Sequence, residues 1–204
     1  MIKLNIVLMK LLLAITVFLS IVTGCADSSG NSANENNQDS AVAKNYYPVK
    51  DLIRNEIAKA DSFFTTFKKY TIQNNKTDSS IIQPEEFRQL ASEFATDELS
   101  KEALEKEYSE ASFLDQTTGF YTFTYSTTNT SLAFQRVDVL ATSGDGFDKI
   151  NSYYLEKISA QGDTLIKKKV YWKAGKSFQV ITETTINNQS PQTGQYKVVW
   201  NELE

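Results

Sequence analysis

The fold is decided by a stretch of alternating side chains, Phe120-Tyr121-Thr122-Phe123-Thr124-Tyr125-Ser126. From Tyr121 onward, aromatic side chains alternate with threonine or serine. This is the pattern of an extended strand, in which successive side chains point to opposite faces. The same two-residue period continues to the end of the chain. It predicts six strands, over residues 119–127, 131–142, 148–160, 163–173, 176–186 and 194–202.

Short stretches rich in Gly, Asn, Asp and Ser separate these strands, and such residues favour turns. Connections this short cannot hold a crossover, so consecutive strands must pair antiparallel. The strands are long, and long strands twist and coil. The sequence therefore predicts a curved six-stranded antiparallel meander over its C-terminal part.

Upstream of the strands, the apolar period lengthens to three and four residues, which is typical of helices. One apolar stripe from Val49 to Tyr70 predicts a long helix, and residues 74–80 are predicted to form a loop. Pro84 suits the start of a second helix, and Ser100 suits the N-cap of a third, short one. The predicted fold class is α+β, with N-terminal helices (one long, two short) packed on the six-stranded sheet.

Three phenylalanines on the long stripe, Phe63, Phe64 and Phe67, are expected to plug the sheet. Their expected partners are Phe123, Val170, Trp172, Val198 and Trp200. The main interpretation of these aromatic side chains is a core. The alternative is an open groove that holds a small molecule.

Charged residues interrupt the alternation at two places. Arg136 and Asp138 point to one side of the second predicted strand. Either the two side chains form an ion pair at the mouth of a pocket, or a bulge in the strand turns both of them toward solvent. Lys167, Lys169 and Lys173 share one strand face, which we interpret as solvated; contact with lipid phosphates or an acidic partner is the alternative.

Residues 26–40 contain no apolar side chain larger than alanine. Such a segment buries too little apolar surface to offset its ordering entropy, so residues 25–45 are predicted to form a flexible tether. Within it, Asp39-Ser40-Ala41 resembles a bacterial O-glycosylation site, an acidic residue followed by Ser/Thr and a small aliphatic residue. Ser40 is therefore a candidate glycosylation site, with plain tether as the alternative.

The N-terminal 25 residues combine a basic flank, an apolar run and the one cysteine of the chain. As a helix, the apolar residues 11–22 would rise about 18 Å, short of the ~30 Å hydrocarbon layer. The run ends in Val22-Thr23-Gly24-Cys25, which resembles the lipobox of bacterial lipoprotein signal peptides. The resemblance implies a signal peptide over residues 1–24 and a lipid on Cys25. An uncleaved membrane anchor is the alternative.

The lipobox resemblance implies a cell-envelope protein held to the membrane by its N-terminal lipid. Ala26 is not the aspartate that retains lipoproteins in the inner membrane of enteric bacteria. The outer membrane is therefore expected if the host has two membranes. Residues 46–204 are predicted to form a single globular domain. No nucleic-acid partner is expected, because the formal net charge is −4 and the longest basic run is Lys167-Lys168-Lys169.

The sequence holds no histidine, and lipidation would occupy its one thiol. This excludes Ser-His-Asp and Cys-His nucleophilic systems and histidine zinc sites. The glycine patterns that bind phosphate and the acidic loops that bind calcium are also absent from the sequence. No catalytic residue, metal or cofactor is predicted, although a Ser-Lys pair or two carboxylates can catalyse without histidine.

Three classes of function remain. We expect a non-catalytic envelope lipoprotein that binds a protein partner or serves in an envelope assembly. The alternative is a carrier of an apolar small molecule held between helix and curved sheet, and a carboxylate-based enzyme is the third class. A filled helix–sheet interface would favour the first class, an elongated apolar cavity the second, and two close inward carboxylates in a cleft the third.

Overall fold

The computed structural model describes residues 46–73, 76–142, 150–187 and 189–201. The predicted signal peptide, Cys25 and the predicted tether with Ser40 lie outside the described residues.

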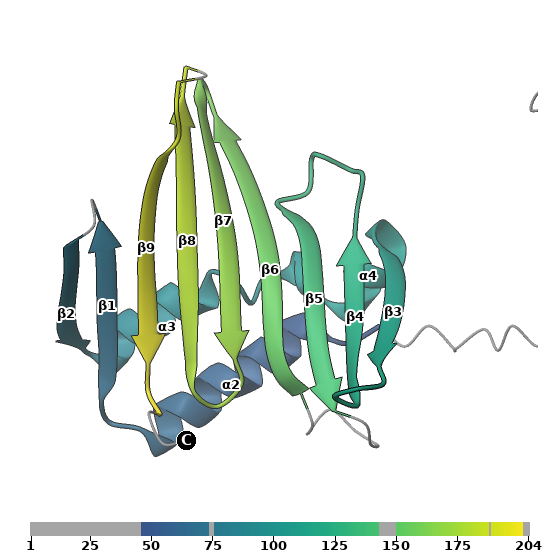
Figure 1. Cartoon of the computed structure of the whole chain (residues 1–204), viewed down its shortest axis with the longest axis horizontal. Coiled ribbons are helices and arrows are strands. Elements are labelled where there is room, and N and C mark those ends of the chain that lie inside the picture. Colours follow the sequence, from purple (N-terminus) through teal and green to yellow (C-terminus); the bar gives the residue numbers. More distant parts are fainter. Residues whose placement is uncertain (1–45, 74–75, 143–149, 188, 202–204) are drawn as a thin grey trace, which may run out of the picture. The chain divides into compact units, whose positions relative to one another are not determined.

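Nine strands form one antiparallel sheet in the order β2-β1-β9-β8-β7-β6-β5-β4-β3 (Figure 1). Strands β3 to β9 follow one another as a meander, and the β1–β2 hairpin pairs beside the last strand, β9. The strands are β1 (Phe67–Gln73), β2 (Lys76–Ile82), β3 (Ser109–Asp115), β4 (Phe120–Ser126), β5 (Phe134–Thr142), β6 (Ile150–Gln161), β7 (Thr164–Lys173), β8 (Ser177–Ile186) and β9 (Gln192–Val199).

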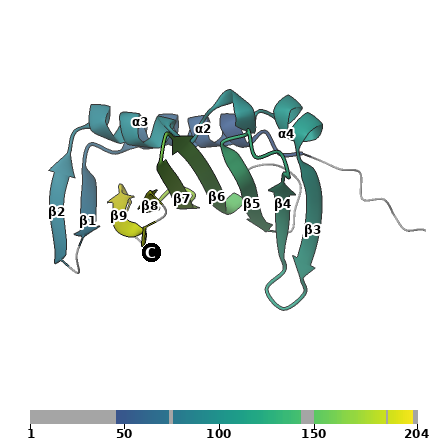
Figure 2. The ribbon, with the colours of Figure 1, turned by 90° about the horizontal axis from the view of Figure 1, so that it is seen from above.

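The helices lie along one face of this sheet, as Figure 2 shows. They are α2 (Val49–Phe63), α3 (Pro84–Ser92), the 3-10 turn η1 (Asp97–Leu99) and α4 (Lys101–Glu107). Pro84 opens α3, where a missing N–H costs nothing. The Ser100 hydroxyl accepts a hydrogen bond from the Ala103 N–H at 3.2 Å and so caps α4. The other face of the sheet carries none of the described helices, and we call it the open face.

The core between the helices and the sheet is mainly aromatic. Phe67 of β1 stacks on Phe87 of α3 with ring centroids 4.2 Å apart. Trp172 stacks on Phe178 at 4.9 Å, and Trp200 meets the Phe87 ring edge-on at 5.3 Å. All five side chains are buried. Side chains therefore fill the helix–sheet interface where these rings lie.

The predicted fold class is wrong. The sheet has nine strands rather than six, the helices are short, and the fold is mostly β. The alternation does locate β4 to β9 close to their observed bounds. The prediction missed β1, β2 and β3, which together form both edges of the sheet and the link to β9.

The largest error lies at Phe64, where the predicted long helix stops. Phe64 has extended backbone angles, and β1 begins at Phe67. Thr65 and Thr66 favour this break, because β-branched residues lose side-chain freedom in a helix. On a strand, Phe67 and Tyr70 point to opposite faces instead of sharing a helical stripe.

The predicted phenylalanine plug is wrong in part. Phe63, the last residue of α2, is 78% exposed. Phe64 is half-buried against the core, and only Phe67 is fully buried. Phe67 reaches the core from the sheet itself, not from a helix packed on it.

The two edge strands lack the burial pattern that reveals a strand. In β2, which lies largely over the predicted loop, every residue before Ile82 is exposed. Most residues of β3 are exposed as well. An edge strand exposed on both faces needs no apolar alternation, so periodicity does not detect it.

Charged side chains join the helix layer to the sheet. Glu98 of η1 accepts hydrogen bonds from the Phe134 N–H at 2.6 Å and the Tyr108 hydroxyl at 2.9 Å. Glu93, which follows α3, pairs with Lys168 at 2.6 Å and Lys157 at 3.1 Å. Burial by itself raises the pKa of Glu93, but the hydrogen bonds and charges of the two lysines outweigh it and hold this pKa below its ordinary value.

Candidate functional site

The open face of the sheet is the candidate functional site. The strand register places Tyr154, Tyr171, Gln179, Lys197 and Tyr70 opposite one another in a single row. Residues directly opposite on neighbouring strands share a face. At about 4.8 Å per strand, this row extends roughly 19 Å across β6, β7, β8, β9 and β1.

Two open hollows lie on this face. The first has a volume of about 480 Å³ and extends from the β7–β8 turn across β9 to β1 and β2. The second, of about 430 Å³, extends from β5 to β9. Lys173, Ser177 and Lys197 line both hollows, so the two are continuous.

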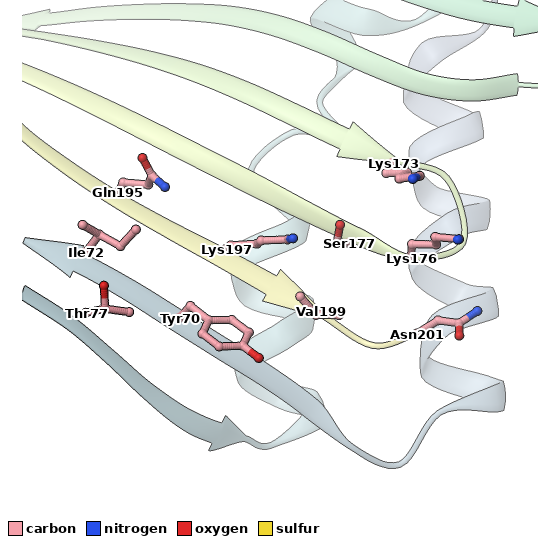
Figure 3. Close-up of a pocket in the computed structure, with 10 residues that line it drawn as sticks. All are labelled: Tyr70, Ile72, Thr77, Lys173, Lys176, Ser177, Gln195, Lys197, Val199 and Asn201. Atoms are coloured by element: carbon pink, nitrogen blue, oxygen red, sulfur yellow. The ribbon is translucent and has the colours of Figure 1, made fainter. Parts of the chain in front are cut away.

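The first hollow is positively charged, and we call it the lysine hollow. Figure 3 shows its ten lining side chains in front of the sheet, with the helices behind. Three of the ten are Lys173, Lys176 and Lys197, and none is acidic. Elsewhere on the open face, Lys169 pairs with Glu183 at 3.0 Å. The three lysines of the hollow form no ion pair with any described residue.

The structure brings Arg136 and Asp138 together on the open face of β5. Arg136 Nη2 lies 2.9 Å from Asp138 Oδ2, and the Thr124 hydroxyl donates to Asp138 at 2.8 Å. The Arg136 side chain is 49% exposed and that of Asp138 17%. Asp138 lines the second hollow, and the register shifts between Phe134 and Arg136. The pair thus lies at the rim of a hollow and beside an irregularity of the strand.

Of the three lysines predicted to share a face of β7, only Lys173 lines a hollow. Sequence reasoning missed Tyr70, Lys176 and Lys197. Lys197 alternates with two buried or half-buried neighbours on β9, which is the signal that places it on the open face. No local pattern brings Tyr70 next to it, because the β1–β9 pair joins distant parts of the chain.

Most of the exposed large apolar side chains of the described residues lie on the open face. Eight large hydrophobic side chains are exposed in the part of the chain that the structure describes. By strand register, five of the eight belong to the open face. These five are Ile72, Ile81, Phe113, Leu165 and Tyr171.

The described residues hold no group of three or more His, Cys, Asp or Glu side chains that could bind a metal. Asp138 is the one carboxylate among the residues that line the two open-face hollows. These hollows therefore do not present a pair of carboxylates. None of the described helices is long and apolar enough to cross a bilayer.

Comparison with protein-family models, with curated proteins and with solved structures finds no match for this chain.

Proposed function

We propose that this chain is a non-catalytic, lipid-anchored envelope protein that binds a protein partner on the open face of its sheet. The observation that carries the proposal is that five of the eight exposed large hydrophobic side chains of the described residues lie on this face, spread from β2 to β3. A partner on this face would remove these apolar side chains from water, and tyrosine is enriched at protein interfaces.

The open face is large enough for such a partner. Nine strands at about 4.8 Å spacing extend roughly 38 Å, and the shortest strands, of seven residues, are about 23 Å long. The product of these two lengths exceeds the ~800 Å² that each partner buries in a standard protein interface.

The filled interface on the other face favours this function over the carrier alternative. A carrier would hold its apolar ligand between the helices and the sheet. Phe67, Phe87, Trp172 and Phe178 occupy that space, and their rings stack in pairs. A ligand there would have to displace packed rings, which costs several kcal/mol.

The anchor in this proposal rests on the lipobox resemblance at residues 22–25, with the outer membrane as the expected location. Two or three acyl chains hold a protein to a bilayer, whereas one chain does so weakly. We expect Cys25→Ser to accumulate as unprocessed precursor without lipid label. Partition of that variant into the detergent phase as a mature, cleaved form would contradict the anchor.

Photo-crosslinking in host cells tests the partner. A photoreactive residue replaces Tyr171 on the open face, and a matched one replaces Lys59, which is exposed on α2. We expect a discrete protein adduct from position 171 and none of that mass from position 59. The proposal is wrong if position 59 gives the same adduct, or if position 171 gives none.

A further inference from the structure

We infer that the lysine hollow binds the carboxylates of an acidic segment of the partner. The inference rests on the proposed function, because it takes the occupant to be a protein. Beyond the proposed function, the inference specifies which chemical group of the partner is bound and where on the open face it binds.

The charge of the hollow is opposite to that of the chain. The whole sequence carries a formal net charge of −4, yet the hollow has three lysines and no acidic lining residue. Like charges gathered without counter-charges repel one another, and a concave wall concentrates their field outward. A negatively charged group that enters the hollow relieves this repulsion.

The structure fixes the backbone positions from which the three lysines extend. Lys173 and Lys176 flank the β7–β8 turn, where Gly175 has a φ of 69°. The Gly175 N–H donates to Glu56 of α2, and the Lys176 carbonyl accepts from the Trp200 N–H at 3.1 Å. Lys197 extends from β9 between Gln179 and Tyr70. The backbone of the site therefore needs no reordering on binding.

The surroundings of the lysines favour a protein over a membrane or a glycan. Ile72 lines the same hollow and is exposed, and the exposed ring of Tyr171 lies in the same row as Lys197. A protein segment can cover apolar side chains and neutralise lysines at once. A flat bilayer surface contacts protruding cations more readily than cations in a hollow. A charged glycan has little apolar surface that could pack on Ile72.

The test uses the full-length protein in neutral detergent and two fluorescent peptides of about twelve residues. One peptide is a Glu-Ala repeat, and the matched control is a Gln-Ala repeat. We expect the Glu peptide to bind at least about tenfold more tightly, and its binding to weaken as salt is raised. Binding of polygalacturonate and of phosphatidylglycerol vesicles is measured as well, to test the glycan and the lipid alternatives.

The matched variants locate the site. Combined Lys173→Gln, Lys176→Gln and Lys197→Gln should weaken Glu-peptide binding about tenfold or more, at an unchanged thermal midpoint. Lys59→Gln, which removes one exposed lysine from α2, should leave binding unchanged. Equal affinity for the two peptides overturns the inference, and so does full binding by the triple variant. Tighter, lysine-dependent binding of polygalacturonate or vesicles overturns the assignment to a protein.

The crosslinking result separates this inference from the proposed function. An adduct from position 171 without Glu-peptide binding overturns the lysine site alone. Lysine-dependent binding of the Glu peptide without an adduct supports the anionic contact and overturns the proposed partner interface.

Discussion

Trp172 and Tyr171 are neighbours on β7, yet they lie in opposite environments. Trp172 is 1% exposed and stacks on Phe178 between the helices and the sheet. Tyr171 is 47% exposed on the open face, beside the Tyr154 ring at 5.0 Å. The same strands thus supply a packed core on one face and an uncovered surface on the other. Substitutions on the two faces should therefore differ in their effect on stability.

The strongest test of this comparison replaces each of these two neighbours by alanine. Trp172→Ala should lower the free energy of unfolding by about 3–5 kcal/mol, because it empties a packed aromatic site. Tyr171→Ala should cost about 1 kcal/mol or less, because it removes one partly solvated ring contact. Urea denaturation measures both. Similar costs for the two variants would mean that the open face is covered in solution.

Phe67 and Phe63 provide a second pair of matched residues. Phe67→Ala should cost about 3–4 kcal/mol, since the ring stacks on Phe87 and is fully buried. Phe63→Ala should change the unfolding free energy by about 0.5 kcal/mol or less, because the side chain is exposed. Urea midpoints decide the outcome. A large loss from Phe63→Ala would instead support a helix that continues beyond Phe63.

Glu93 makes the covered face sensitive to acid. Its pKa is lower in the folded protein than in the unfolded chain, so its contribution is present above the unfolded pKa and is lost as pH falls through the folded pKa. Glu93→Gln should cost about 2 kcal/mol at neutral pH. Unfolding free energies of both proteins, measured from neutral to acid pH, should converge as the carboxylate titrates. A constant gap down to the acid limit would argue against this ion pair.

The smallest effect is expected on the open face. Arg136→Ala breaks the ion pair with Asp138, but the Arg136 side chain is 49% exposed and screened by water. We expect a loss below about 1 kcal/mol, which shrinks further when salt is added. Thermal midpoints at low and high salt measure it. A loss as large as that of Glu93→Gln would mean that the ion pair is buried, and would contradict its position at the exposed rim of the hollow.

Part of the difference between the two sheet faces was predicted from the sequence. Sequence reasoning placed Lys173 on one face of a strand and expected Trp172 in the core, because alternation along a strand is a local property. It did not predict the lysine hollow. That hollow needs Tyr70, and the step of three from Phe67 to Tyr70 predicts a helix rather than a strand.

The sequence by itself determined the strands from β4 to β9 and their antiparallel order, since period-two alternation and short turns act between neighbours in the chain. It also carries the lipobox resemblance, which predicts the anchor. Only the tertiary structure decided that β1 pairs with β9, bringing Lys68 opposite Val199. Only the tertiary structure decided that Phe67 reaches the core from β1 rather than from a helix. The alternation indicates which face of the sheet is buried, but which elements cover that face depends on how the whole chain buries its apolar surface.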